Sequence, residues 1–209
     1  MIRVKKEKHQ AVFLDRDGTI NEIVSFPDIG LLDSPLVPEQ FKLHEHVPEA
    51  IRIFNHLGLL VIVVSNQPAI QKGKLTRSNF QKIREKMFND LLKEKARIDA
   101  DYYCFHVSQE NCDCRKPKPG MLLQAARDLN IDLSTSYMVG DSVVDVKAGN
   151  SVGCRTFLIG TLKCDLCKLI EKEGCKPYLI VTNLLEAARI IKKEVKERKS
   201  FLTQQVQKK

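Results

Sequence analysis

The stretch that decides the fold is Ala11–Gly18, AVFLDRDG, in which a short apolar run ends in two aspartates and a glycine. Four consecutive apolar residues predict a strand that is buried on both faces. Open α/β sheets bind their ligands outside the carboxyl ends of such strands. Asp15 and Asp17 are one residue apart, so on extended backbone both carboxylates point to the same side and can reach one ligand. Taken alone, the segment also fits an ordinary Asp-Gly turn after a strand.

A second apolar run, Leu59–Val64, is β-branched at four of its six positions and predicts another strand. It stops abruptly at three polar residues, Ser65, Asn66 and Gln67. A hydroxyl and backbone amides at this position can hold phosphate oxygens. We therefore expect this segment to contribute to the same site as Asp15.

Two later segments supply cationic and acidic groups. Arg115 and Lys116 follow the strand-like segment Asp101–His106 and offer fixed positive charge to a phosphoryl group. A further apolar run ends in Asp141, an oxygen ligand suited to Mg²⁺. Asp145 lies four residues further on the same face of a predicted helix, where it would orient Lys116 rather than bind metal.

The combination of these groups fits phosphoryl transfer. One carboxylate can attack phosphorus and form an aspartyl phosphate, while its neighbour protonates the leaving oxygen and later activates water. Two anions facing an anionic substrate would repel it, so the site requires a hard cation such as Mg²⁺ held by carboxylate oxygens.

A cysteine- and histidine-rich segment precedes the Arg-Lys pair. Cys104, His106, Cys112 and Cys114 offer three thiolates and one imidazole within eleven residues, a complete tetrahedral set for a closed structural Zn²⁺ site. Their spacings differ from those of zinc fingers, and incidental thiols are the alternative. Because Cys114 adjoins Arg115, we expect the zinc to position the phosphate-binding cations and to take no part in catalysis.

These segments resemble the four ordered motifs of the haloacid-dehalogenase-like phosphatases, over roughly residues 11–160. The Cys/His segment followed by Arg115-Lys116-Pro117 is similar, more narrowly, to that of the D-glycero-D-manno-heptose 1,7-bisphosphate 7-phosphatases and the related histidinol-phosphate phosphatases. The resemblance implies removal of the C7 phosphate from a heptose bisphosphate, in activated heptose synthesis for cell-surface polysaccharide such as lipopolysaccharide.

The resemblance also implies a role for each matching residue. The catalytic residues would be Asp15 as nucleophile, Asp17 as acid/base, and Ser65 and Lys116 as stabilisers of the phosphoryl group. Mg²⁺ would be held by Asp15, by the backbone carbonyl of Asp17 and by Asp141. The substrate-binding residues would be Asn66, Gln67 and Arg115.

Three other functions remain open from the sequence. A histidinol-phosphate phosphatase is the main rival within the enzyme class. A DNA 3′-phosphatase shares the first aspartate motif but needs a basic surface beside its site. A zinc-stabilised binding module with a decayed active site would not require the full set of polar residues.

The net charge of +8 is concentrated at the chain ends: residues 1–10 carry +3, residues 189–209 carry +6, and residues 11–188 carry −1. A nucleic-acid groove would keep Lys and Arg beside the site, so we expect no specific nucleic-acid partner. The longest apolar stretch is far shorter than the roughly 20 residues that span a bilayer, so no membrane partner is expected. We expect a monomer that acts on a small phosphorylated sugar.

Seven cysteines are an odd number, and the cluster needs thiolates rather than disulfides, which favours the reducing cytoplasm. We interpret Cys154 as a core residue. Cys164, Cys167 and Cys175 are more simply incidental thiols than a second metal site. His44 and His46 are interpreted as exposed loop histidines.

The alternation of strand-like and helix-like segments predicts a Rossmann-like, three-layer α/β fold with a mostly parallel central sheet, a zinc-bound loop and no large cap domain. Residues 1–199 are expected to form one domain, and 200–209 a disordered polar tail. Residues 21–47 show no sustained period and would arch over the substrate. Beyond those already named, the expected strands are Tyr137–Gly140, Thr156–Ile159 and Tyr178–Val181. The expected helices are Pro48–Leu57, Thr76–Lys95, Met121–Leu129, one from Asp141 or Ser142, and Asn183–Lys199.

Overall fold

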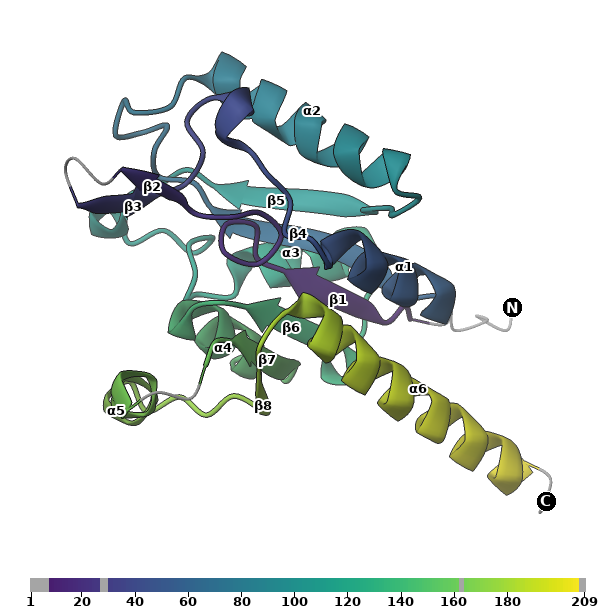
Figure 1. Cartoon of the computed structure of the whole chain (residues 1–209). Helices are drawn as coiled ribbons and strands as arrows, with labels where there is room; N and C mark the ends of the chain where they lie inside the picture. Colours follow the sequence, from purple (N-terminus) through teal and green to yellow (C-terminus); the bar gives the residue numbers. More distant parts are fainter. Residues whose placement is uncertain (1–7, 27–29, 162–163, 207–209) are drawn as a thin grey trace, which may run out of the picture.

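A six-stranded parallel sheet forms the middle layer of the protein (Figure 1). The computed structural model describes residues 8–26, 30–161 and 164–206. The strand order is β5-β4-β1-β6-β7-β8, and every neighbouring pair is parallel. The strands are β1 (Ala11–Leu14), β4 (Leu60–Asn66), β5 (Ala100–Cys104), β6 (Tyr137–Gly140), β7 (Arg155–Ile159) and β8 (Leu179–Val181). The predicted fold class and strands are confirmed, with strand ends shifted by at most two residues.

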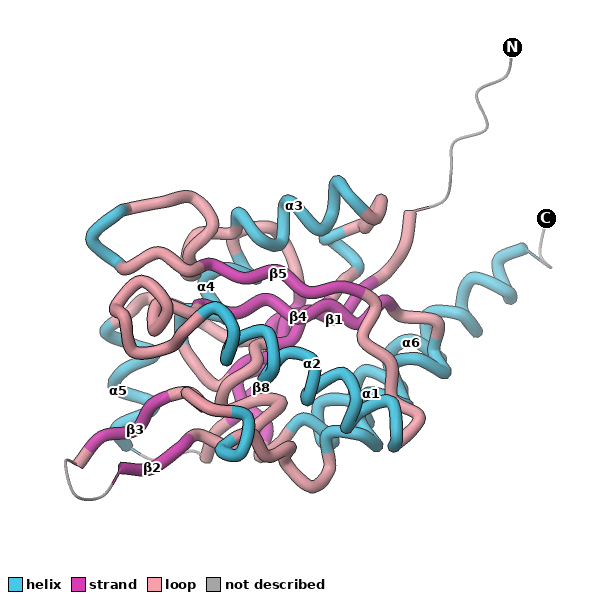
Figure 2. The backbone as a smooth tube through the Cα atoms, turned by 90° about the horizontal axis from the view of Figure 1, so that it is seen from above, coloured by secondary structure: helices cyan, strands magenta, loops and turns pink. Residues whose placement is uncertain are grey.

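Helices cover both faces of the sheet, and Figure 2 shows α3 on one side and α1 and α2 on the other. They are α1 (Val47–Leu57), α2 (Arg77–Lys93), α3 (Gly120–Asp128), α4 (Val143–Asn150), α5 (Cys164–Lys172) and α6 (Leu184–Val206). The described residues also form the short 3-10 helices η2 (Pro38–Gln40), η3 (Ser108–Glu110) and η4 (Leu133–Thr135). Val12 and Leu14 of β1 pack with α1, α2 and α6, whereas Ala11 and Phe13 pack with α3 and α4. This alternation explains why β1 is apolar at every position.

Local sequence signals place the helix ends. Thr76 precedes α2, and its hydroxyl accepts a hydrogen bond from the backbone N–H of Asn79. Gly58 ends α1 in the left-handed region, with φ of 78°. Ser142 and Asp145 form a reciprocal capping box at the start of α4. Each of these devices satisfies backbone groups that a helix end leaves without partners.

The segment between β1 and α1 is more ordered than its sequence suggested. It contains an antiparallel pair, β2 (Val24–Phe26) with β3 (Leu31–Asp33), followed by η2; residues 27–29 between the strands lie outside the described part. The hairpin lies beyond the carboxyl ends of the parallel strands (Figure 1). β2 (VSF) and β3 (LLD) have three residues each and include a polar one, so neither a period nor an apolar run marked them in the sequence.

The C-terminal end differs from the expected tail. Helix α6 continues to Val206, whereas a disordered tail was expected for residues 200–209, of which 207–209 lie outside the described part. Residues 200–206 contain no proline or glycine that would end a helix, and the polar composition alone was misleading. The last turns extend beyond the sheet (Figure 1), past Val195, which is still buried against the core. Within the described ranges, no helix is long and apolar enough to cross a membrane.

Candidate active site

Asp15, directly after β1, is at the centre of the site and has only 9% of its surface exposed. Its Oδ1 accepts a hydrogen bond from Lys116 Nζ at 2.6 Å. The same ammonium donates to the carbonyl of Val64 at 2.7 Å and lies 2.7 Å from Asp145 Oδ1. The predicted pairing of Asp145 with Lys116 is thus confirmed, and groups from the ends of β1 and β4 and from the first turn of α4 meet around one buried cation.

The carboxylates of Asp15, Asp141 and Asp145 lie together, with ligand oxygens within 4.8 Å of one another. Burial raises the pKa of Asp15 to about 7, with Lys116 opposing the shift and Asp145 and Asp141 adding to it. Partial burial and the carboxylate of Asp145 raise the pKa of Asp141 to about 6. Crowded carboxylates hold protons tightly because their charges repel one another. This all-oxygen set therefore fits Mg²⁺, whose charge would relieve the repulsion.

The contacts distinguish the roles of the three acids. Both oxygens of Asp145 are engaged, one by Lys116 and the other by the backbone N–H of Ser142 at 3.1 Å. Asp15 and Asp141 are therefore better placed than Asp145 to hold a cation. A Cβ on Gly18 would lie 2.1 Å from Asp141 Oδ2, and its φ is +84°. Only glycine lets the turn after β1 approach Asp141 this closely.

Asp17 belongs to a different network. Its carboxylate accepts hydrogen bonds from the side chains of Arg16, Asn21 and Gln67. Strand alternation predicts that Arg16 points away from Asp17, but β1 already ends at Leu14 and the chain bends there. The contact between Arg16 and Asp17 was therefore missed, and sequence period alone could not have found it.

The polar residues at the end of β4 are mostly supporting groups. Asn66 joins the loop of Lys116 through two hydrogen bonds, donating to the carbonyl at 3.0 Å and accepting from the N–H at 3.1 Å. Ser65 and Gln67 are both 1% exposed, and Gln67 Nε2 donates to Ser65 Oγ at 3.0 Å. Gln67 Nε2 also donates to Asp17, and Oε1 accepts from Arg16, so the amide that was expected to contact substrate is engaged within the protein. Its contact with substrate stays a prediction.

A cavity of about 240 Å³ opens beside Asp17. Its lining includes the side chains of Asp33, Asn66, Lys72, Lys74 and Arg115. Lys74 lies 3.1 Å from Asp33, which belongs to β3 of the hairpin. Sequence reasoning missed the two lysines, although their cluster between the end of β4 and the start of α2 was visible.

The four residues predicted to bind zinc meet at the carboxyl end of β5. Sulfur–sulfur distances among Cys104, Cys112 and Cys114 are 3.2 to 3.6 Å, and His106 Nδ1 lies 3.3 Å from Cys114. This convergence of three sulfurs and one imidazole nitrogen fits a tetrahedral Zn²⁺. Arg115 Nη1 donates to the carbonyl of His106 at 3.1 Å, so the cluster and the cationic loop are directly joined.

The remaining cysteines form no second cluster within the part of the chain that the structure describes. Cys154 and Cys175 are buried and Cys167 is exposed, whereas the side chain of Cys164 lies outside the described set. The prediction of Cys154 as a core residue is confirmed.

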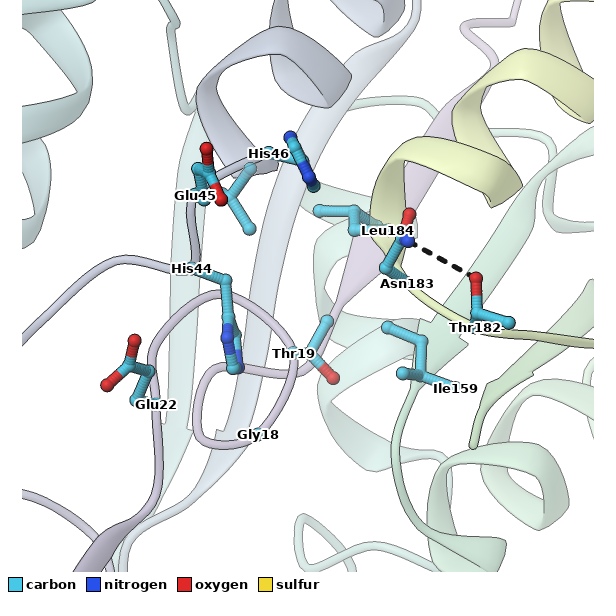
Figure 3. Close-up of a pocket in the computed structure, with 11 residues that line it drawn as sticks. Gly18, Thr19, Glu22, His44, Glu45, His46, Ile159, Thr182, Asn183 and Leu184 are labelled. Carbon is cyan, nitrogen blue, oxygen red and sulfur yellow. Dashed lines mark hydrogen bonds between the residues drawn. The ribbon is translucent and has the colours of Figure 1, made fainter. Parts of the chain in front are cut away.

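A second cavity, of about 320 Å³, is lined by Gly18 and Thr19 of the turn after β1 and by residues 44–46 before α1 (Figure 3). Its lining includes His44 and His46, whose rings lie well apart in Figure 3, together with the acids Glu22 and Glu45. The acidic side chains disfavour an anionic ester there. The cavity beside Asp17, with its three cations, is the better place for a phosphorylated ligand.

Comparisons with known proteins agree with this geometry. The HAD-hydrolase-like family profile matches residues 113–187. The D-glycero-beta-D-manno-heptose-1,7-bisphosphate 7-phosphatase of Pasteurella multocida is 39% identical over 163 residues, which are 74% of this chain and 83% of that protein. The protein of the same name from Haemophilus influenzae is 40% identical over 147 residues, 68% of this chain and 76% of that protein.

A solved structure is also similar. The D,D-heptose 1,7-bisphosphate phosphatase from B. bronchiseptica, complexed with magnesium and phosphate, has a TM-score of 0.76 and 26% identity, covering 88% of this chain and 99% of that one. Sheet, carboxylate site and comparisons together define a haloacid-dehalogenase-like phosphatase, an enzyme of the phosphomonoester hydrolases. Within that class, the chain belongs to the heptose-1,7-bisphosphate 7-phosphatase family.

Proposed function

We propose that this protein removes the C7 phosphate of D-glycero-D-manno-heptose 1,7-bisphosphate through an aspartyl phosphate on Asp15, with Mg²⁺ as cofactor and Zn²⁺ as a structural ion. The observation that carries the proposal is the buried Asp15 carboxylate, paired with Lys116 at 2.6 Å and clustered with Asp141. The named relatives supply the substrate, and their beta designation supplies the anomer that we propose.

The chain's own residues perform each step of the proposed reaction. Lys116 holds Asp15 Oδ1, which leaves Oδ2 to attack phosphorus. As that bond forms, the bond between phosphorus and the C7 oxygen breaks, and Asp17 gives its proton to the leaving oxygen. Asp17 then takes a proton from water, which attacks phosphorus and frees Asp15. Ser65 would donate its hydroxyl proton to a phosphoryl oxygen.

Asp15, the carbonyl of Asp17 and Asp141 would hold the Mg²⁺. When bound, the cation supplies positive charge that keeps the nucleophile ionised and neutralises the phosphoryl oxygens. This matters because burial and the neighbouring carboxylates, opposed by Lys116, raise the pKa of Asp15 to about 7, and a neutral carboxylic acid is a poor nucleophile.

The cavity beside Asp17 favours a bisphosphate over histidinol phosphate. Lys72, Lys74 and Arg115 surround it with positive charge that would attract a second phosphate. The same charges would repel the amine of histidinol phosphate. Arg115 and Asn66 line this cavity, which supports their expected part in substrate binding.

The proposal includes a monomer in a reducing cytoplasm, without a nucleic-acid or membrane partner. The described cysteines carry free thiols, as a zinc cluster requires.

The test is a phosphate-release assay with Mg²⁺ over both heptose bisphosphate anomers, histidinol phosphate and a 3′-phosphorylated oligonucleotide. We expect the highest kcat/KM with the beta bisphosphate and no turnover by Asp15→Asn, which should keep its fold by circular dichroism. Preference for histidinol phosphate would overturn the substrate assignment. Salt-sensitive activity on the oligonucleotide would favour the DNA phosphatase instead. Absence of turnover on every ester would favour the binding module.

A further inference from the structure

The carboxylate of Asp17 is surrounded by hydrogen-bond donors from three side chains. Arg16 donates to Oδ1 from Nε at 3.1 Å and from Nη2 at 3.0 Å, and Nη2 also lies 3.0 Å from Oδ2. Asn21 Nδ2 donates to Oδ1 at 3.0 Å and Gln67 Nε2 to Oδ2 at 2.6 Å. Both carboxylate oxygens are therefore held from more than one direction.

Arg16 is buried completely, with 0% of its surface exposed. Asp17 is its ion-pair partner, and the ring of Phe80 lies 6.0 Å from the guanidinium carbon. A buried guanidinium requires an anion close by, because desolvating an unpaired charge is strongly unfavourable. The position of Arg16 is therefore tied to that of the Asp17 carboxylate.

Gln67 connects this pair to the rest of the site. Its Oε1 accepts from Arg16 Nη2 at 2.9 Å, while its Nε2 donates to both Asp17 and Ser65. Its backbone N–H donates to the carbonyl of Cys104 at 2.6 Å, which fixes Gln67 to the end of β5. One amide thus holds two groups that the proposed reaction uses, and it does so from a rigid sheet.

We propose that Gln67 and Arg16 are positioning residues that set the direction of the Asp17 carboxylate toward the leaving oxygen of the substrate. This inference rests on the proposed function, since it needs Asp17 as the general acid. A general acid works only within about 2.6–3.2 Å of the atom that it protonates. A displacement of about 1 Å can lower a rate by roughly 100-fold, so an orienting amide behind the acid has a measurable effect.

The experiment compares two leaving groups in Gln67→Met and Arg16→Lys. Gln67→Met roughly keeps the volume of the side chain and removes its hydrogen bonds. Arg16→Lys keeps the positive charge and removes the planar guanidinium with its paired N–H donors. The probes are the heptose bisphosphate, whose alkoxide must be protonated as it leaves, and p-nitrophenyl phosphate, whose phenolate leaves without a proton. The readout is kcat/KM, which covers the steps up to phosphoryl transfer to Asp15.

We expect kcat/KM for the heptose bisphosphate to fall about 10-fold or more in both variants. For p-nitrophenyl phosphate it should change less than about 2-fold in Arg16→Lys, and in Gln67→Met, which also loses the hydrogen bond to Ser65, it should fall clearly less than for the heptose bisphosphate. Thr19→Val is the matched control. Thr19 is 1% exposed in the same turn, and its hydroxyl has no partner among the described residues, so both values should stay unchanged.

Equal losses on both substrates would overturn the inference, because they would show a general disturbance of the site. Unchanged activity of the variants on both substrates would also overturn the inference. Circular dichroism shows whether each variant is folded. If only one variant folds, the ratio of its two kcat/KM values decides. A wild-type protein inactive on both esters would instead contradict the proposed function itself.

Discussion

Lys116→Met would test the charge balance on which the site depends. Lys116 is 3% exposed, and its ammonium lies 2.6 Å from Asp15 and 2.7 Å from Asp145. The substitution roughly keeps the side-chain volume but leaves two buried carboxylates without their cation. Breaking a buried ion pair by removing one partner costs about 3–5 kcal/mol, against a total stability of about 5–15 kcal/mol for a domain. We therefore expect a large fall in the free energy of unfolding.

The assay is urea unfolding in Mg²⁺-free buffer, with Lys118→Met as the matched control. Lys118 pairs with Asp113 at 3.3 Å, but the Asp113 side chain is 98% exposed, so this loss should stay below about 1 kcal/mol. The double variant Lys116→Met/Asp145→Asn should recover part of the stability, because it removes one of the two buried carboxylates that lost their cation. The reasoning is refuted if Lys116→Met and Lys118→Met unfold at the same urea concentration.

Four further predictions concern metals, pH and substrate. The pKa of Asp15 is about 7 in the folded protein and 3.8 ordinarily, so between these pH values the folded state binds more protons than the unfolded state. The Asp15 carboxyl therefore destabilises the Mg²⁺-free protein increasingly as pH rises through this range. The stability of Asp15→Asn relative to wild type should therefore increase from pH 5 to pH 8 in urea titrations; a constant difference would contradict this. Chelation of zinc should lower phosphatase activity at saturating Mg²⁺, and normal turnover by protein shown by metal analysis to lack zinc would exclude its positioning role. Gly18→Ala should weaken Mg²⁺ binding about 10-fold or more in calorimetric titrations, since its Cβ would lie 2.1 Å from Asp141 Oδ2. Lys72→Gln should raise KM for the heptose bisphosphate several-fold and leave KM for p-nitrophenyl phosphate unchanged; equal changes would place the second phosphate elsewhere.

The sequence predicted the sheet well because its strands are short, apolar and separated by helices with clear end signals. Gly58, Thr76 and Ser142 occupy the helix ends that their residue types favour. The meeting of Asp15 with Lys116 followed from a general rule, that the carboxyl ends of parallel strands share one edge. No periodic pattern was needed for that inference.

The parts that sequence reasoning missed depend on tertiary contacts. Arg16 folds back onto Asp17 because the backbone bends after the strand ends at Leu14. The apolar run showed the end of the strand but not the direction of the residues that follow it. Gln67 carries an amide of the kind that often binds ligands. Only the packing around it shows that this amide is already hydrogen-bonded to Asp17. Lys72 and Lys74 became part of the site only when the position of the hairpin was known.

The packing of α6 on α1 has a consequence for synthesis of the chain on the ribosome. Ala188, Ile191 and Val195, near the end of the chain, share one core with Ile51 and Phe54 of α1. Strand β1 likewise lies between β4 and β6, and β6 begins more than 120 residues after it. The part of the chain up to β4 therefore leaves the ribosome with apolar surface that only residues much later in the sequence can cover. Such distant contacts slow folding and leave the incomplete sheet open to aggregation.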